Sequence, residues 1–177
     1  MDTATVHPLY AVSSRDVWKE LADAWFCVEG EGEAAGLLAD AFRQIGLHVE
    51  SIQTSEKVRY HAAAVMASNL VVGLYSRAAA ELELCGYSPE AAEQALVPLF
   101  LGNARHLAAD GVEAALTGPA QRGDMQTIEA HLGVLDGDDK EIYQLLTKEL
   151  LDIAKRRRAH EAQKACADAI DHQKGNA

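Results

Sequence analysis

The chain has 177 residues, of which 49% are hydrophobic, an ordinary content for a globular protein with one or two domains. Its formal net charge of −11 excludes an extended basic surface, so no nucleic-acid partner is expected. Three widely spaced cysteines fit neither a disulfide framework nor a zinc site. With no signal peptide at Met1 and no apolar run of about 18 residues, we predict a cytoplasmic protein without a membrane segment.

The first part of the chain alternates between extended and helical patterns. Strands are predicted over 4–12, 24–29 and 47–52, and helices over 13–21 and 33–45. This order is typical of a parallel or mixed sheet. Three short strands leave sheet edges and one face uncovered, which predicts pairing with something outside this sequence.

A glycine-rich turn separates the second strand from the helix that follows it. From Gly30 to Gly36 the spacing is GxGxxxG, whereas dinucleotide-binding turns use GxGxxG. Three carboxylates, those of Glu29, Glu31 and Glu33, surround the helix start and would repel a pyrophosphate. We therefore predict a flexible acidic turn and no cofactor-binding residues in this chain.

The stretch 56–86 is predicted to form one long central helix. It contains no proline, Thr54 and Ser55 can cap its start, and Gly86 ends it. Over 62–80, apolar side chains occur all round the helix rather than along one stripe. Such a helix should be buried by other helices, either in this chain or in a partner subunit.

Further helices are predicted after the central one. The first begins with Ser88 as cap and Pro89 at the first helical position, and Pro98 should kink it. A break at Asp110 and Gly111 precedes a short helix, and Asp124 caps a later helix. The last strong helix is predicted over 140–157, and the basic run 155–158 is interpreted as its solvated end.

These elements predict a mainly α fold, a multi-helix bundle around the central helix, preceded by a small α/β portion. The expected boundaries are 1–54 for the α/β portion, 55–160 for the helical domain and 161–177 for a frayed tail.

The first candidate site lies at the start of the central helix. Lys57 and His61 are four residues apart and therefore share one helix face, and Ala64 and Ser68 continue that face with small side chains. This arrangement would leave room for a ligand beside an ammonium and an imidazole. The alternative is structural: Lys57 is a solvated lysine at a helix end, and His61 is a satisfied, semi-buried histidine.

Two runs carry a resemblance to a known family: KVRYHAAAVMASN, and NARHLAADGVEAALTGPAQRGDMQTIEAHL. They resemble the helical C-terminal domain, catalogued as a domain of unknown function, of Rossmann-like NAD(P)-dependent oxidoreductases. That domain is similar to the C-terminal domains of 6-phosphogluconate dehydrogenase and ketopantoate reductase. The resemblance covers about residues 5–157. It implies NADP or NAD for the full-length family protein, and a nucleotide-binding half, with its GxGxxG turn, that is missing here.

The resemblance also implies roles for particular residues. In the wider hydroxyacid dehydrogenase group, a lysine with an asparagine four residues later serves the carbonyl. Here the lysine is Lys57 and the second position is His61, so both are candidate catalytic residues, with Lys57 polarising or protonating a carbonyl oxygen. His61 or His131 would orient that oxygen or shuttle the proton. The candidate substrate-binding residues are Asn69, Thr117, Arg122, Asp124 and His131.

The segment 117–131 brings a hydroxyl, a guanidinium, a carboxylate and an imidazole close together in sequence. Arg122 could bind a substrate carboxylate with its fork of donors. The structural alternative has Asp124 as a helix cap, Arg122 in a salt bridge with it, and Thr127 bonded to backbone. The functional interpretation predicts that this segment meets Lys57 and His61 in one cleft.

Two functions remain open at this point. One is a helical substrate-binding and dimerisation domain of an oxidoreductase acting on a small oxo- or hydroxy-acid, inactive without its nucleotide-binding domain. The other is a dimeric structural domain without catalysis. Both predict a homodimer through the helical part, and the first adds a separate nucleotide-binding domain as a partner. A metal hydrolase built on His61, His106 and His131 lacks recognised ligand spacing, so no metal is expected.

Overall fold

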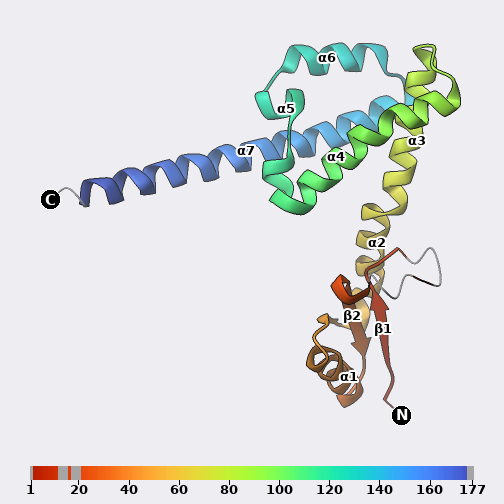
Figure 1. The fold of residues 1–177 in the computed structure, drawn as a ribbon, viewed down its shortest axis with the longest axis vertical. Helices are drawn as coiled ribbons and strands as arrows, with labels where there is room; N and C mark the ends of the chain where they lie inside the picture. Colours follow the sequence, from red (N-terminus) through yellow and green to blue (C-terminus); the bar gives the residue numbers. More distant parts are fainter. Residues whose placement is uncertain (1, 12–15, 17–20, 175–177) are drawn as a thin grey trace. The chain divides into compact units, whose positions relative to one another are not determined.

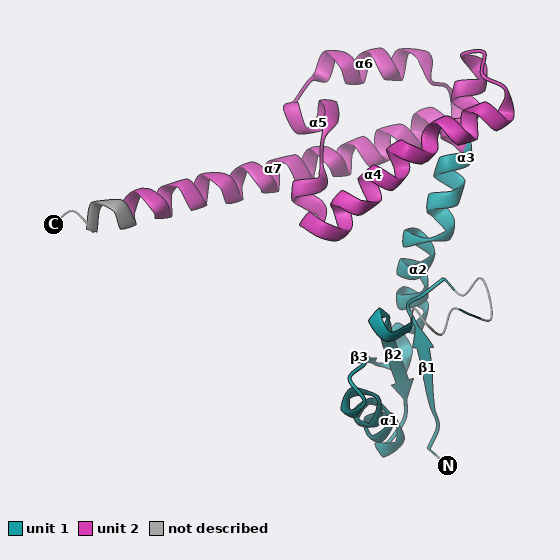
Figure 2. Ribbon diagram, in the orientation of Figure 1, with its two compact units in different colours: residues 1–76 teal, residues 77–177 magenta. Residues whose placement is uncertain are grey.

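The computed structural model describes residues 2–11, 16 and 21–174, and their side chains as far as residue 170. The chain divides into two compact units, Met1–Ser76 and Arg77–Ala177 (Figure 2). As predicted, the fold is mainly helical, with a small three-stranded sheet near the N-terminus (Figure 1).

The sheet of the first unit is mixed. Strands β1 (Ala4–Pro8), β2 (Trp25–Gly30) and β3 (His48–Ile52) lie in that order, with β1 antiparallel and β3 parallel to β2. Helix α1 (Glu33–Gln44) makes the crossover between the parallel strands. Strand β1 ends at Pro8, earlier than predicted. The helix expected over 13–21 lies largely outside the described residues.

The two faces of this sheet differ in character, because successive side chains of a strand point to opposite sides. On one face Phe26, Val28 and Val49 pack with Ala39 of α1 to form the core, and Val28 is fully buried. The opposite face carries the intervening residues, which are mostly polar: Thr5, His7, Cys27 and Glu29.

The predicted long helix is instead two helices. After a 3-10 turn, η3 (Thr54–Glu56), come α2 (Lys57–Ala67) and α3 (Asn69–Leu84). Ser68 breaks the helix with φ −127° and ψ −82°. Its Oγ donates to the Ala64 carbonyl at 2.7 Å, a local bond that competes with regular helical pairing. The predicted caps are also wrong, since no side chain caps α2.

This helical stretch is largely uncovered within the chain. No residue of α2 is buried, and Ala79 is the one buried residue of α3. Burial of this helical stretch by a partner subunit stays a prediction. By length and composition alone, Thr54–Leu84 is also apolar enough to cross a membrane, contrary to our expectation; core helices of soluble proteins share that property.

The second unit begins within α3, which ends before Gly86 as expected. Helix α4 (Pro89–Ala115) starts as predicted, with Ser88 Oγ accepting from the Ala91 N–H at 3.3 Å. Gly111, at φ 78° and ψ 176°, interrupts it near its end. The short helix α5 (Gly118–Arg122) and helix α6 (Met125–Val134) follow.

Helix α7 (Gly137–Lys174) continues well beyond the end predicted at residue 157, so the expected frayed tail is helical through Lys174. It packs against α4, α5 and α6 (Figure 1). The basic run is not its solvated end. Instead, Arg157 Nη1 donates to the carbonyl oxygens of Glu113 and Leu116, both at 3.4 Å, and so meets the negative end of α4.

Candidate functional site

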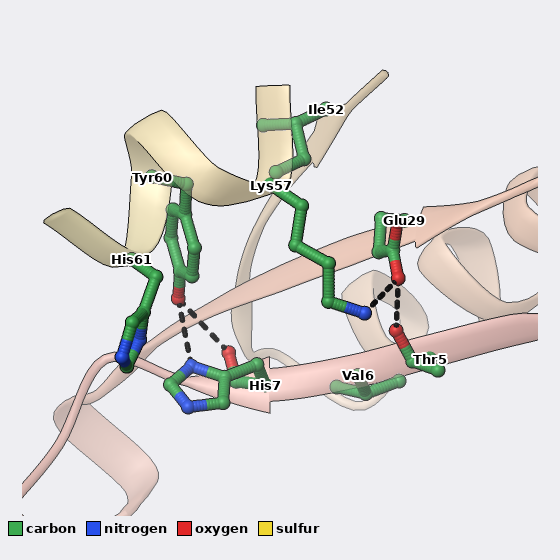
Figure 3. A pocket seen from close by; sticks show the side chains of 8 residues that line it. All are labelled: Thr5, Val6, His7, Glu29, Ile52, Lys57, Tyr60 and His61. Atoms are coloured by element: carbon green, nitrogen blue, oxygen red, sulfur yellow. Dashed lines mark hydrogen bonds and ion pairs between the residues drawn. The ribbon is translucent and has the colours of Figure 1, made fainter. Parts of the chain in front are cut away.

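A cavity of about 220 Å³ lies on the polar face of the sheet (Figure 3). Strands β1 and β2 form its floor, and the first turns of α2 form its wall. Positions 57, 60 and 61 share one face of α2, so their side chains all reach the cavity. The lining residues come from β1, β2, β3 and α2: Thr5, Val6, His7, Glu29, Ile52, Lys57, Tyr60 and His61.

An ion pair sits at one side of this cavity. Lys57 Nζ donates to Glu29 Oε1, and Thr5 Oγ1 donates to the same oxygen at 2.9 Å. The hydrogen bond from Lys57, followed by that from Thr5, lowers the pKa of Glu29 below its ordinary value. Glu29 is only 9% exposed, and its Oε2 is buried without a hydrogen bond from the described residues. The carboxylate is therefore held ionised beside the ammonium.

A tyrosine–histidine pair forms the other side. Tyr60 Oη lies 3.0 Å from His7 Nδ1, and the two rings meet edge to face with centroids 5.7 Å apart. Burial raises the pKa of the Tyr60 hydroxyl, and burial together with the charge of Glu29 raises that of the Cys27 thiol. Tyr60 and Cys27 therefore stay protonated at neutral pH.

The structure places both predicted catalytic residues at this cavity. Lys57 begins α2 with its side chain 57% exposed, as the structural alternative expects, and it is also paired with Glu29. His61 is exposed and points from α2 beside Tyr60 (Figure 3). Asn69 is not among the lining residues; its Oδ1 accepts from Ser68 Oγ at 3.1 Å, at the break between α2 and α3.

Besides Val6 and Ile52, four polar residues that the sequence analysis did not propose for this site also line it: Thr5, His7, Glu29 and Tyr60. The sequence predicts Glu29 as part of the acidic turn, whereas the strand pleat turns its side chain toward Lys57. The sequence did indicate that these residues share one face of the sheet, because polar residues of β1 and β2 occupy every second position. Recognising it required the antiparallel register that pairs Thr5 with Glu29 and His7 with Cys27.

The glycine turn borders a second cavity, which does not fit a dinucleotide phosphate. Its lining includes Gly30, Glu31, Gly32 and Gly36 beside the start of α1. The Asp2 carboxylate occupies the space next to the Gly32 backbone, where a side chain would otherwise fit. Carboxylates at this helix start oppose a bound pyrophosphate.

The second unit holds the other predicted residues. Asp124 caps α6, accepting from the Thr127 N–H at 3.1 Å and from its hydroxyl at 2.7 Å. These bonds, with a smaller contribution from Arg122 at 3.9 Å, lower the pKa of Asp124. His131 Nδ1 lies 2.7 Å from Tyr143 Oη. Thr117 precedes α5 without capping it.

The candidate residues thus form one group in each unit, and their convergence on one cleft stays a prediction. The Asp124 cap and the Arg122–Asp124 pair match the structural alternative considered for that segment, whereas the Thr127 hydroxyl bonds to the Asp124 carboxylate and not to backbone. Across the described part of the chain, no group of three or more His, Cys, Asp or Glu side chains is arranged to hold a metal ion.

The fold and the site define a class: a mainly helical protein with a small mixed sheet, in which a glutamate of strand β2 pairs with a lysine of helix α2 beside a cavity. The chain belongs to the family described as Domain of unknown function (DUF2520), whose model matches residues 24–150. No curated protein sequence matches it significantly.

Two solved structures are similar to this chain. Protein TM1727 from Thermotoga maritima shares 27% identity with a TM-score of 0.74, over 88% of this chain and 62% of its own. The putative NADP oxidoreductase BF3122 from Bacteroides fragilis shares the fold at 23% identity with a TM-score of 0.63, over 86% of this chain and 58% of its own. This chain spans less than two thirds of either.

Proposed function

We propose that this chain is the substrate-binding and dimerisation part of an NAD(P)-dependent oxidoreductase that acts on a small oxo- or hydroxy-acid. The observation that carries the proposal is the ordered Lys57–Glu29 pair at the edge of a small cavity. The shared fold with a protein described as a putative NADP oxidoreductase supports the reaction class. In this proposal the helices correspond to the C-terminal domain of 6-phosphogluconate dehydrogenase and ketopantoate reductase.

The chemistry assigned to the cavity is proton donation. Lys57 has three N–H donors, of which Glu29 takes one, so the others can bond to a carbonyl oxygen in the cavity. A proton would pass from the Lys57 ammonium to that oxygen during reduction, and return during oxidation. His61 lies at the same wall and can relay the proton to solvent.

The dinucleotide is assigned to a domain outside these residues. The carboxylates at the glycine turn oppose phosphate binding, and hydride transfer needs a bound nicotinamide that side chains cannot replace. We expect calorimetric titration of this chain with NADPH or NADH to give no saturable heat at submillimolar ligand. Clear binding would overturn the interpretation of that turn.

Dimerisation is proposed for the apolar surface of the helices. Val72 and Leu84 of α3 and Leu99 of α4 are each more than two-thirds exposed in the single chain.

The proposed substrate class is tested by binding. The ¹⁵N-labelled chain would be titrated with three- to six-carbon oxo- and hydroxy-acids, and the amide shifts of β1, β2 and α2 followed by NMR. We expect saturable shifts around the cavity that Lys57→Met abolishes and that Lys164→Met, on the exposed part of α7, leaves unchanged. If no acid binds, the alternative of a dimeric structural domain without catalysis is the better description.

A further inference from the structure

The cavity on the polar face of the sheet has an unusual charge balance for an acid-binding site. Lys57 is the one ammonium or guanidinium among its lining residues, and Glu29 already neutralises it. Of the remaining side chains there, His7 is paired with Tyr60, and His61 is the other titratable group on the α2 wall. The cavity thus presents a compensated ion pair rather than a free positive charge.

The carboxylate of Glu29 is fixed in place. Oε1 takes hydrogen bonds from Lys57 and Thr5, and the side chain is buried against the sheet. A second carboxylate entering beside Lys57 would lose its strong hydration and meet the charge of Glu29 at close range. A neutral group of the same shape loses less hydration and meets no charge repulsion.

We propose that this cavity admits a neutral hydroxyl, carbonyl or amide group and excludes carboxylates, with Glu29 as the residue that determines this specificity. The inference rests on the proposed function in taking the cavity as a substrate site, and it deepens that function by naming the part of the substrate that enters. The acidic end of an oxo- or hydroxy-acid then lies outside the cavity. Lys57 faces the oxygen that gains or loses a proton.

The test uses two probes of nearly identical shape, glycolamide and glycolate, which differ in charge. Dissociation constants would be measured by NMR titration of the ¹⁵N-labelled full chain at pH 7. We expect glycolamide to bind the native protein at least about tenfold more tightly than glycolate, because the like charge of Glu29 opposes the anion. In Glu29→Gln, which keeps the oxygen that accepts from Lys57 and Thr5, glycolate should become the tighter ligand.

A matched control is Glu31→Gln. Glu31 lies in the adjacent turn, lines the other cavity and is exposed, so its neutralisation should leave the glycolamide preference unchanged. If Glu29→Gln fails to fold, Lys57→Gln supplies the opposite perturbation, since it leaves the negative charge uncompensated and should weaken glycolate binding further. Unchanged glycolate binding in that variant would contradict the inference.

Three results would overturn the inference: equal or tighter binding of glycolate to the native protein, an unchanged preference in Glu29→Gln, or binding of neither probe. Failure of the proposed function is a separate outcome. In that case glycolamide still binds with the Glu29-dependent preference, while none of the larger oxo- and hydroxy-acids binds. The cavity would then select neutral groups over carboxylates as we propose, but oxo- and hydroxy-acids would not be its substrates.

Discussion

Replacing Gly30 by alanine tests how β1 is held against β2, and therefore how the cavity floor is built. Gly30 faces Ala4 across the two strands. A Cβ added at Gly30 would lie 2.8 Å from Ala4 Cα and 2.9 Å from Ala4 Cβ, and would also press against the Thr3 carbonyl oxygen. Two of these three atoms are backbone, so no side-chain rotation can relieve the overlap.

The expected magnitude follows from this geometry. Inserting a methyl group into a filled space costs about 1–3 kcal/mol, and the backbone contacts place Gly30→Ala in the upper half of that range. Gly36 is a matched control, because a Cβ there meets no atom within 4 Å and the residue lies in α1. In a helix, glycine to alanine should stabilise by roughly 0.5–1 kcal/mol. The two variants should therefore differ by about 3 kcal/mol.

Urea denaturation followed by circular dichroism would measure both variants, and amide hydrogen exchange would show where Gly30→Ala acts. We expect faster exchange in β1, together with weaker ligand binding, because β1 carries Thr5 and His7 of the cavity. A Gly30→Ala protein as stable as the native one, with β1 still protected, would refute the reasoning that close strand approach requires glycine here.

Other predictions concern single residues. Ser88→Ala should lower the free energy of unfolding by about 1 kcal/mol, because the hydroxyl caps α4, and Ser88→Asp should largely retain it. Folding lowers the pKa of Glu29 from its ordinary value of about 4.5. The ionised carboxylate therefore stabilises the folded state at pH values above about 4.5, and this contribution is lost as the pH falls through the folded-state pKa. The free energy of unfolding of Glu29→Gln should therefore fall less on acidification than that of the native protein. An identical pH profile for the two proteins would contradict a stabilising role of the Glu29 carboxylate. In sedimentation experiments at micromolar concentration we expect the native protein to be a dimer. Val72→Asp should dissociate this dimer, whereas Val134→Asp, at the exposed end of α6, should leave it intact. A monomeric native protein would argue against the proposed interface.

Local patterns in the sequence determined most of the elements. Ser88 and Pro89 mark a helix start by themselves, because a hydroxyl cap followed by proline satisfies the first turn without tertiary help. Asp124 does the same for α6, and Gly111 marks a break by its positive φ. The order of strands and helices likewise follows from periodicity and turn residues.

The break at Ser68 was outside the reach of such patterns. Most of its neighbours are good helix formers, although Asn69 is not. The Ser68 hydroxyl bonds to the Ala64 carbonyl, and propensity alone does not show that this local bond will interrupt the helix. The extent of α7 was missed for a related reason. Its last part is polar and alanine-rich and has no apolar face that would predict a helix. It nevertheless continues a packed helix, and extending an existing helix needs no new nucleation step.

For the candidate site too, one part follows from local sequence spacing and the other part from tertiary contacts. The spacing of Lys57 and His61 predicted that both lie on one helix face, because the helical period fixes which residues are neighbours. That this face meets Thr5, His7 and Glu29 depended on strand register and on which side of the sheet α2 covers. Those are contacts between segments more than twenty residues apart in sequence, and the identity of the buried partner of Lys57 was therefore decided by the tertiary structure alone.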